Sequence, residues 1–105
     1  WASWCGPCRA ENPNVVSAFE KYKNKKFTVL GVSLDDNKAD WQAAIIADKL
    51  NWQHISDLKK WESTVISTYQ FSGIPYNVLI DPNGVIIAKE LRGQDLQNTL
   101  ASILK

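Results

Sequence analysis

Both cysteines of this chain stand two residues apart, in the motif Cys5-Gly6-Pro7-Cys8 near the start of its 105 residues. This spacing lets one turn of a helix hold two sulfur atoms close enough to bond. The residues that follow predict a helix, and a helix N-terminus presents unpaired N–H groups and a partial positive charge. A Cys-X-X-Cys in that setting has a thiol pKa below that of a free cysteine, which favours the reactive thiolate. The motif therefore predicts a redox-active pair.

The composition is that of an ordinary globular domain, 45% hydrophobic and 22% charged. The formal net charge of +1 gives no support for a nucleic-acid partner. No apolar run approaches the ~20 residues of a membrane span. We expect a single domain over residues 1–105, and we expect it to be a fragment of a longer protein, because the chain opens so close to its reactive centre.

Apolar periodicity and turn signals divide the chain into alternating helices and strands. The predicted helices cover residues 6–24, 38–50, 60–69 and 94–104. The predicted strands cover residues 27–34, 52–55, 76–80 and 85–91. Asn37 is expected to cap the second helix, and residues 81–84 fit a type I turn between the last two strands. The order predicts an α/β fold with helices on both faces of a mixed sheet.

Apolar residues at helical spacing are expected to face the core. They are Val15, Phe19 and Tyr22 of the first helix, Trp41, Ala44 and Ile45 of the second, and Leu96, Leu100 and Ile103 of the last. The strand over residues 27–34 is nearly all apolar, which is typical of a buried, parallel strand.

This pattern resembles the thioredoxin fold. The stretch Trp4-Cys5-Gly6-Pro7-Cys8 matches the active-site motif of that family, and Pro13 matches the proline that kinks its first helix. Ile74-Pro75 matches the isoleucine–cis-proline loop that faces the cysteine pair in the fold. The resemblance covers essentially the whole chain.

Two further blocks resemble the TlpA/ResA-like branch, which consists of bacterial extracytoplasmic thiol-disulfide oxidoreductases. Residues 8–13 fit its C-[RK]-x-E-x-P pattern, residues 73–84 fit its second block, and residues 38–50 resemble its helical insertion. The resemblance implies a three-layer α/β/α fold with a mixed central sheet. The family's N-terminal strands, including the central strand that enters the motif, are missing from this chain. We therefore expect a longer parent protein or another chain to fill that place.

Cys5 is the predicted nucleophile, because the outer cysteine at a helix start has both the dipole and access to solvent. Cys8, one turn further in, is expected to attack the mixed disulfide at Cys5 and release the reduced substrate. Pro7 stiffens the start of the helix without the loss of a hydrogen bond. In the family, Gly6 and Pro7 at these positions go with a reducing potential.

Glu11 lies three residues after Cys8 on the same helix face, where a carboxylate can carry the proton that leaves Cys8. The resemblance supports this role, and the alternative is a solvated helix glutamate. Ile74 is expected to offer its backbone to an extended substrate next to a cis Pro75. Trp4 flanks the cysteines and either shapes the contact surface or packs locally.

No metal site is expected. The only histidine, His54, reads as a strand-edge residue, and Asp35 with Asp36 reads as a loop at a strand end. Structural zinc needs four protein ligands, which two cysteines and one histidine do not supply.

The resulting hypothesis is a thiol-disulfide oxidoreductase that reduces or exchanges disulfides in disulfide- or dithiol-containing proteins, without a bound cofactor. The resemblance implies a bacterial periplasmic or cell-envelope location, a membrane electron donor and a role in cell redox homeostasis. A peroxiredoxin-like peroxidase is one alternative, although Ala2 stands where that family requires threonine. A copper-binding or assembly module that uses the two thiolates is the other, although the chain has no methionine.

Overall fold

The first helix, α1 (Gly6–Tyr22), begins where the sequence predicts, in a computed structural model that describes residues 1–104. Cys5 is its N-cap: its backbone is extended and its sulfur faces the N–H of Cys8. Pro13 lies inside the helix, and a short 3₁₀ turn at Lys23–Lys25 follows it. Residue 105, which the predicted domain includes, lies outside the described residues.

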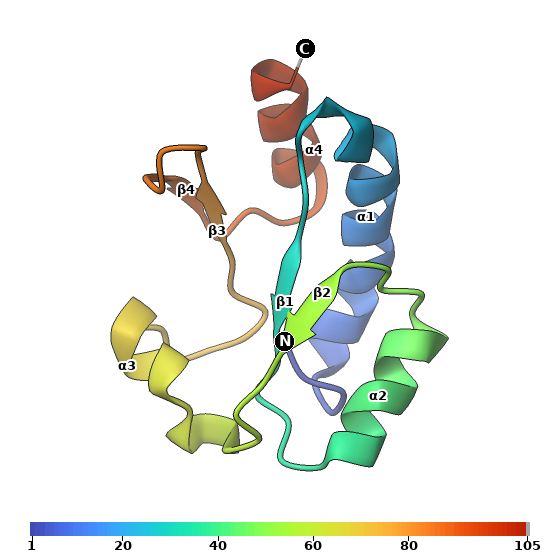
Figure 1. Cartoon of the computed structure of the whole chain (residues 1–105), viewed down its shortest axis with the longest axis vertical. Helices are drawn as coiled ribbons and strands as arrows, with labels where there is room; N and C mark the ends of the chain where they lie inside the picture. Colours follow the sequence, from blue (N-terminus) through green and yellow to red (C-terminus); the bar gives the residue numbers. More distant parts are fainter. Residues whose placement is uncertain (105) are drawn as a thin grey trace.

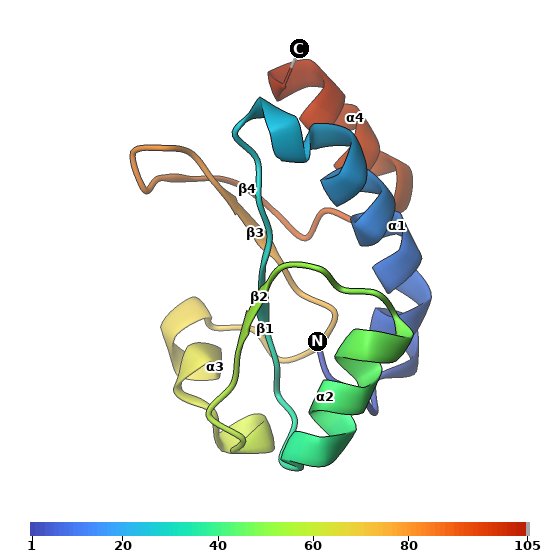
Figure 2. The ribbon, with the colours of Figure 1, turned by 45° about the vertical axis from the view of Figure 1, so that its right-hand side comes forward.

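The helix α4 (Gly93–Ile103) packs beside α1 (Figures 1 and 2). Their interface contains a cluster of buried side chains, with partly buried residues packed around it. The buried members are Ala18, Tyr22, Leu96 and Leu100. Ile103 was expected to face this core, which is wrong, because 49% of its surface is exposed. Leu104, the next residue, packs against the cluster in its place.

The strand β1 (Leu30–Val32) pairs in parallel with β2 (Gln53–Ile55), and Gly31 lies opposite His54. It is shorter than predicted, and Leu30 is 54% exposed rather than buried. Only β2 forms a ladder with β1 within residues 1–104. At the other edge the backbone of Trp1 bonds to the Val32 carbonyl and to the Leu34 N–H.

The hairpin of β3 (Val78–Ile80) and β4 (Ile86–Lys89) is antiparallel, as predicted. Its turn closes through the N–H of Gly84 on the carbonyl of Asp81, at 3.0 Å. The expected mixed sheet is therefore present as two separate pieces, one parallel and one antiparallel, in the described chain. Figure 1 shows them apart, with no strand between them.

The predicted second helix is α2 (Lys38–Ala47), capped as expected by Asn37, which accepts from the N–H of Asp40. It ends before the predicted boundary, because Lys49 has a left-handed φ of 57°. Trp41, Ala44 and Ile45 are buried or half-buried, as predicted.

The predicted helix over residues 60–69 is divided into a 3₁₀ turn (Lys60–Glu62) and α3 (Thr64–Tyr69) by the extended backbone of Ser63. In Figure 2, α3 lies on one side of the strands, and α1 with α4 lies on the other. No helix in residues 1–104 is long and apolar enough to cross a membrane.

Candidate functional site

A disulfide joins Cys5 and Cys8, whose Cα atoms are 5.2 Å apart. Cys5 lies just before the first helical residue, and the Cys8 N–H points at its sulfur from 3.2 Å. This N–H is one of the unpaired donors that every helix start presents. The same donor that faces sulfur here can stabilise a Cys5 thiolate after reduction.

The disulfide lies in one of the two apolar clusters of the described chain. It packs with Ala2 and Leu34, and partly buried residues from α3 and from the loop after it cover it, among them Ile66 and Phe71. Cys5 is 6% exposed and Cys8 is 1% exposed. Cys5 is the more exposed of the two cysteines, as predicted. The open solvent access predicted for Cys5 is wrong, because α3 and its loop lie over the pair.

The Ile74–Pro75 peptide bond is cis, as predicted. The Ile74 carbonyl oxygen lies 3.8 Å from the Cys5 sulfur, so the loop faces the redox pair. A cavity of about 490 Å³ opens beside this loop. Its lining includes Phe71, Ile74 and Tyr76, and the rings of Phe71 and Tyr76 are stacked 4.8 Å apart.

Trp4 is 44% exposed and its ring lies 6.2 Å from that of Trp61, which is 43% exposed. The ammonium group of Lys60 lies 5.4 Å from the Trp4 ring centre, within range of a cation–π contact. Sequence reasoning missed Trp61 and Lys60, because nothing local places a residue near 60 beside the motif. Gly6 and Pro7 are exposed at the same end of α1.

Glu11 is half-buried and holds the start of α4. Its Oε2 accepts hydrogen bonds from the Gly93 N–H at 3.0 Å and from the Asn14 amide at 2.8 Å. Arg92, the N-cap of α4, makes no capping hydrogen bond through its side chain. Glu11 therefore supplies a cap that α4 lacks in its own sequence, a contact that the prediction of a proton carrier did not include.

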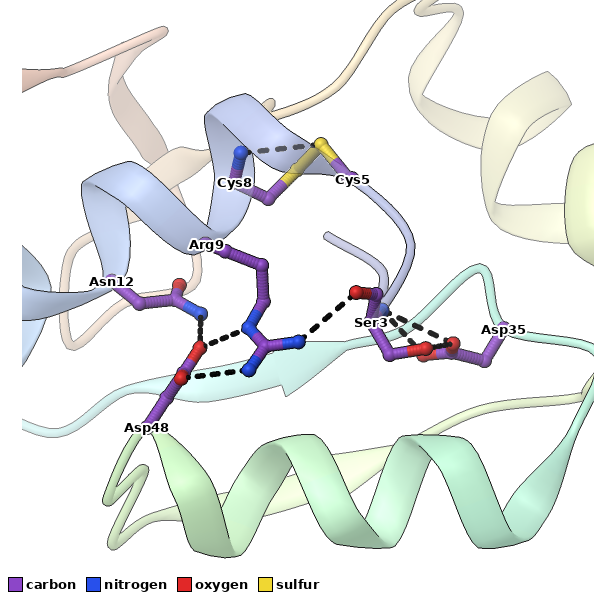
Figure 3. A network of polar contacts seen from close by, with 7 residues as sticks. All are labelled: Ser3, Cys5, Cys8, Arg9, Asn12, Asp35 and Asp48. Carbon is purple, nitrogen blue, oxygen red and sulfur yellow. Dashed lines mark hydrogen bonds and ion pairs between the residues drawn. A yellow bond between two sulfur atoms is a disulfide. The ribbon is translucent and has the colours of Figure 1, made fainter.

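Two polar groups converge on Ser3 next to the disulfide, as Figure 3 shows. Asp35, fully buried, accepts from the N–H and the hydroxyl of Ser3 and from the hydroxyl of Ser33. Asp35 lies in a loop, as predicted, but its burial was not predicted. A carboxylate that is buried in this way needs such donors, because an uncompensated buried charge is costly.

Arg9 approaches Ser3 from the other side (Figure 3). Its Nη1 donates to the Ser3 carbonyl at 3.1 Å, while Nε and Nη2 form a two-pronged pair with Asp48. Asn12 donates to the same carboxylate at 2.9 Å. The hydrogen bond from Arg9 lowers the pKa of Asp48 below its usual value. Sequence reasoning missed Asp48, which lies 39 residues from Arg9.

His54 is half-buried between aromatic rings, with Trp52 stacked at 5.9 Å and Trp1 edge-on at 6.0 Å. Its Nε2 lies 3.0 Å from the Leu50 carbonyl, and burial lowers its pKa below the usual value. Across residues 1–104, no three potential ligand side chains of His, Cys, Asp or Glu gather at a point where they could hold a metal ion.

Comparison with known proteins places these features in a wider group. A sequence model described as thioredoxin-like matches residues 1–86. The thiol-disulfide oxidoreductase ResA of Bacillus thuringiensis subsp. konkukian is 28% identical over 105 residues, which is the whole chain. The chain spans 58% of the length of that relative.

Solved structures agree with this likeness. The thioredoxin domain of a thiol-disulfide oxidoreductase from Bacteroides vulgatus superposes with a TM-score of 0.92 at 39% identity, over 100% of this chain and 75% of that one. A thiol-disulfide oxidoreductase from Bacteroides fragilis also gives 0.92, at 35% identity, over 99% of this chain and 77% of that one. The split sheet is therefore compatible with the three-layer fold that the sequence predicts.

Proposed function

Because this chain belongs to the thioredoxin-like family, we propose that its Cys5–Cys8 pair reduces or exchanges disulfides in proteins. The observation that carries the proposal is the disulfide at the N-terminus of α1, with the Ile74 carbonyl facing it. The names of the reported relatives support it, since each is a thiol-disulfide oxidoreductase. They favour disulfide exchange over the peroxidase and the copper module.

The reaction starts from the dithiol form. The Cys5 thiolate attacks one sulfur of a substrate disulfide, and the other substrate sulfur leaves as a thiolate that takes up a proton. The Cys8 thiolate then attacks the Cys5 sulfur, so that the Cys5–Cys8 bond forms and the Cys5–substrate bond breaks. Two electrons pass from the pair to the substrate, and the disulfide form described above is the product.

Cys5 takes the first role because it is the more exposed cysteine and faces the Cys8 N–H. The substrate reaches it through a narrow opening, since only 6% of Cys5 is exposed. Gly6 and Pro7, both exposed, form one side of the approach. Their small size and rigidity let a substrate chain lie close to the sulfur.

On the opposite side, Ile74 and Pro75 contact the substrate backbone. An extended segment adds to this loop as a further strand, the general mode by which sheet edges bind peptides. Trp4 borders the same approach with a half-exposed ring. These residues together form the substrate-binding surface in the proposal.

Glu11 accepts the proton that Cys8 loses before it attacks. Its two hydrogen bonds to Gly93 and Asn14 both use Oε2, and the second oxygen of the carboxylate is the one that would take the proton. The domain, residues 1–105, is one unit of a longer protein. That protein lies outside the cytoplasm of a bacterium and draws electrons from a membrane partner, as the resemblance to ResA-like proteins suggests.

The test is insulin reduction with dithiothreitol as electron source. The wild-type domain should accelerate reduction, and Cys5→Ser should abolish the effect, because it removes the nucleophile. Cys8→Ser should accumulate a mixed disulfide through Cys5, visible by non-reducing electrophoresis and mass spectrometry. A parallel titration with Cu(I) tests the alternative that the two thiolates form a copper-binding module. Tight stoichiometric copper binding by a folded domain that reduces no disulfide would overturn the proposal.

A further inference from the structure

Ser3 is held through every polar group that it has. Its N–H lies 3.1 and 3.2 Å from the two carboxylate oxygens of Asp35, and its hydroxyl donates to the same carboxylate. Its carbonyl accepts from Arg9 at 3.1 Å. A residue in a connecting loop does not need three such anchors to stay folded, since loop backbones usually turn their polar groups to water.

The anchor on the carbonyl side is itself fixed. Arg9 grips Asp48 through Nε at 2.5 Å and Nη2 at 3.0 Å, and Asn12 donates to the same carboxylate at 2.9 Å. A two-pronged guanidinium–carboxylate pair sets orientation as well as energy. Asp48 is the residue at which α2 ends, so the pair ties α2 to the loop before the cysteines.

The position of Cys5 depends on that loop. Cys5 precedes the helix and has an extended backbone, with φ −90° and ψ 104°. Its carbonyl accepts the first helical hydrogen bond, from the Arg9 N–H at 3.0 Å, but its N–H side lies outside the helix and is set by the loop. Its N–H bonds to Ala2, the neighbour of Ser3. An anchor at Ser3 therefore restricts the direction in which the Cys5 sulfur points toward Cys8.

We propose that the Ser3 anchor, formed by Asp35 on one side and Arg9 with Asp48 on the other, positions Cys5 for ring closure with Cys8. The inference rests on the proposed function, because it concerns the step in which the Cys8 thiolate displaces substrate from the Cys5 sulfur. In that step the Cys5–Cys8 bond forms, the Cys5–substrate bond breaks, and the substrate sulfur leaves with the electron pair and takes a proton. Arg9, Asp48 and Asp35 are positioning residues, since none of them touches the reacting sulfurs.

The expected effect follows from effective concentration. Two thiols held in a bonding geometry react as if highly concentrated, and freedom in one of them lowers that concentration. A loosened Ser3 loop frees the Cys5 thiol in the dithiol and the mixed disulfide, whereas the closed disulfide restrains itself. The equilibrium constant for closure should fall about three- to tenfold, and tenfold corresponds to about 30 mV for a two-electron couple.

The experiment uses Asp48→Asn and Arg9→Lys in the whole chain. Asp48→Asn removes the charge that orients the guanidinium. Arg9→Lys keeps the positive charge but loses the rigid planar fork that bonds both Asp48 oxygens in parallel while a third N–H reaches the Ser3 carbonyl. Glu20→Gln is the matched control, because it removes an exposed ion pair between Glu20 of α1 and Lys23 of the 3₁₀ turn that follows. Folding of each variant is checked by circular dichroism, and Arg9→Lys serves if Asp48→Asn fails to fold.

The measurements are the disulfide equilibrium in glutathione buffers and the decay rate of a mixed disulfide formed at Cys5. Both variants should lower the equilibrium constant and slow the decay three- to tenfold, and the control should leave both unchanged. A purely structural role would destabilise the oxidised and reduced forms equally and leave the equilibrium constant as in wild type, which would overturn the inference. A wild-type value for Arg9→Lys beside a shifted Asp48→Asn would also overturn it, because charge alone would then explain the shift. Neither readout needs insulin turnover, so a failure of the proposed function is seen separately.

Discussion

Replacement of Glu11 separates the two roles that its position allows. Its Oε2 accepts from the first N–H of α4, on Gly93, and from the Asn14 amide. A buried hydrogen bond to a charged group contributes about 1.5–3 kcal/mol. Glu11 is half-buried, so each of its two hydrogen bonds should contribute about 1 kcal/mol. The negative charge at a helix N-terminus adds about 0.5 kcal/mol. Glu11→Ala should therefore lower the free energy of unfolding by about 2.5 kcal/mol.

Glu11→Gln keeps an oxygen at that place and loses only the charge, so its cost should be about 0.5–1 kcal/mol. The assay is urea unfolding of the disulfide form, followed by tryptophan fluorescence, with the change in midpoint converted through the slope. Glu20→Ala is the control, because the exposed ion pair between Glu20 of α1 and Lys23 just after it contributes at most about 1 kcal/mol. A Glu11→Ala midpoint indistinguishable from wild type would refute the capping argument.

The same variants report on chemistry. If Glu11 also accepts the proton of Cys8, Glu11→Gln should slow disulfide exchange more at neutral pH than at high pH, where hydroxide removes the proton. If Glu11 only caps α4, the rate should fall by the same factor at every pH. If the pH profile of Glu11→Gln runs parallel to that of the wild type, Glu11 does not carry the proton and only caps α4.

Three further outcomes follow from packing and burial. Gly31→Ala should cost about 1–3 kcal/mol in urea unfolding, because its Cβ would lie 2.5 Å from Nδ1 of His54; a loss under about 0.5 kcal/mol would contradict this contact. Leu100→Ala should cost about 2–5 kcal/mol, since Leu100 is 1% exposed, while Ile103→Ala should cost under about 1 kcal/mol; equal costs would contradict the observed orientation of α4. Burial lowers the pKa of His54, so the unfolded chain takes up a proton first as the pH falls below about 6.5, and stability should decline there. His54→Gln should flatten that part of a stability-against-pH curve, and an unchanged slope would count against the burial.

Features that depend on near neighbours in the chain were predictable. The start of α1 at Gly6, the Asn37 cap and the hairpin turn at Asp81 each rest on hydrogen bonds over at most four residues. Such contacts are encoded by the identity and spacing of a few adjacent residues, which a single sequence displays. The resemblance to a known family added the facing of Ile74 toward Cys5, which no local signal contains.

Features that depend on distant contacts were missed. Glu11 reaches Gly93 across 82 positions, and Ser3 reaches Asp35 across 32. The identity of a glutamate or an aspartate does not reveal its partner, because many donors elsewhere in the chain could satisfy it. The prediction that Cys5 is open to solvent was wrong for the same reason, since the residues that cover it come from α3 and the loop after it.

By itself the sequence determined the chemistry available to this protein: two cysteines at a helix start, in a spacing that permits a disulfide. Only the tertiary structure decided how that chemistry is held. It placed α3 over the pair, Ser3 between Asp35 and Arg9, and Glu11 at the start of α4. Local geometry follows from short-range hydrogen bonds and periodicity, whereas burial and long-range polar pairing emerge only when all elements pack at once.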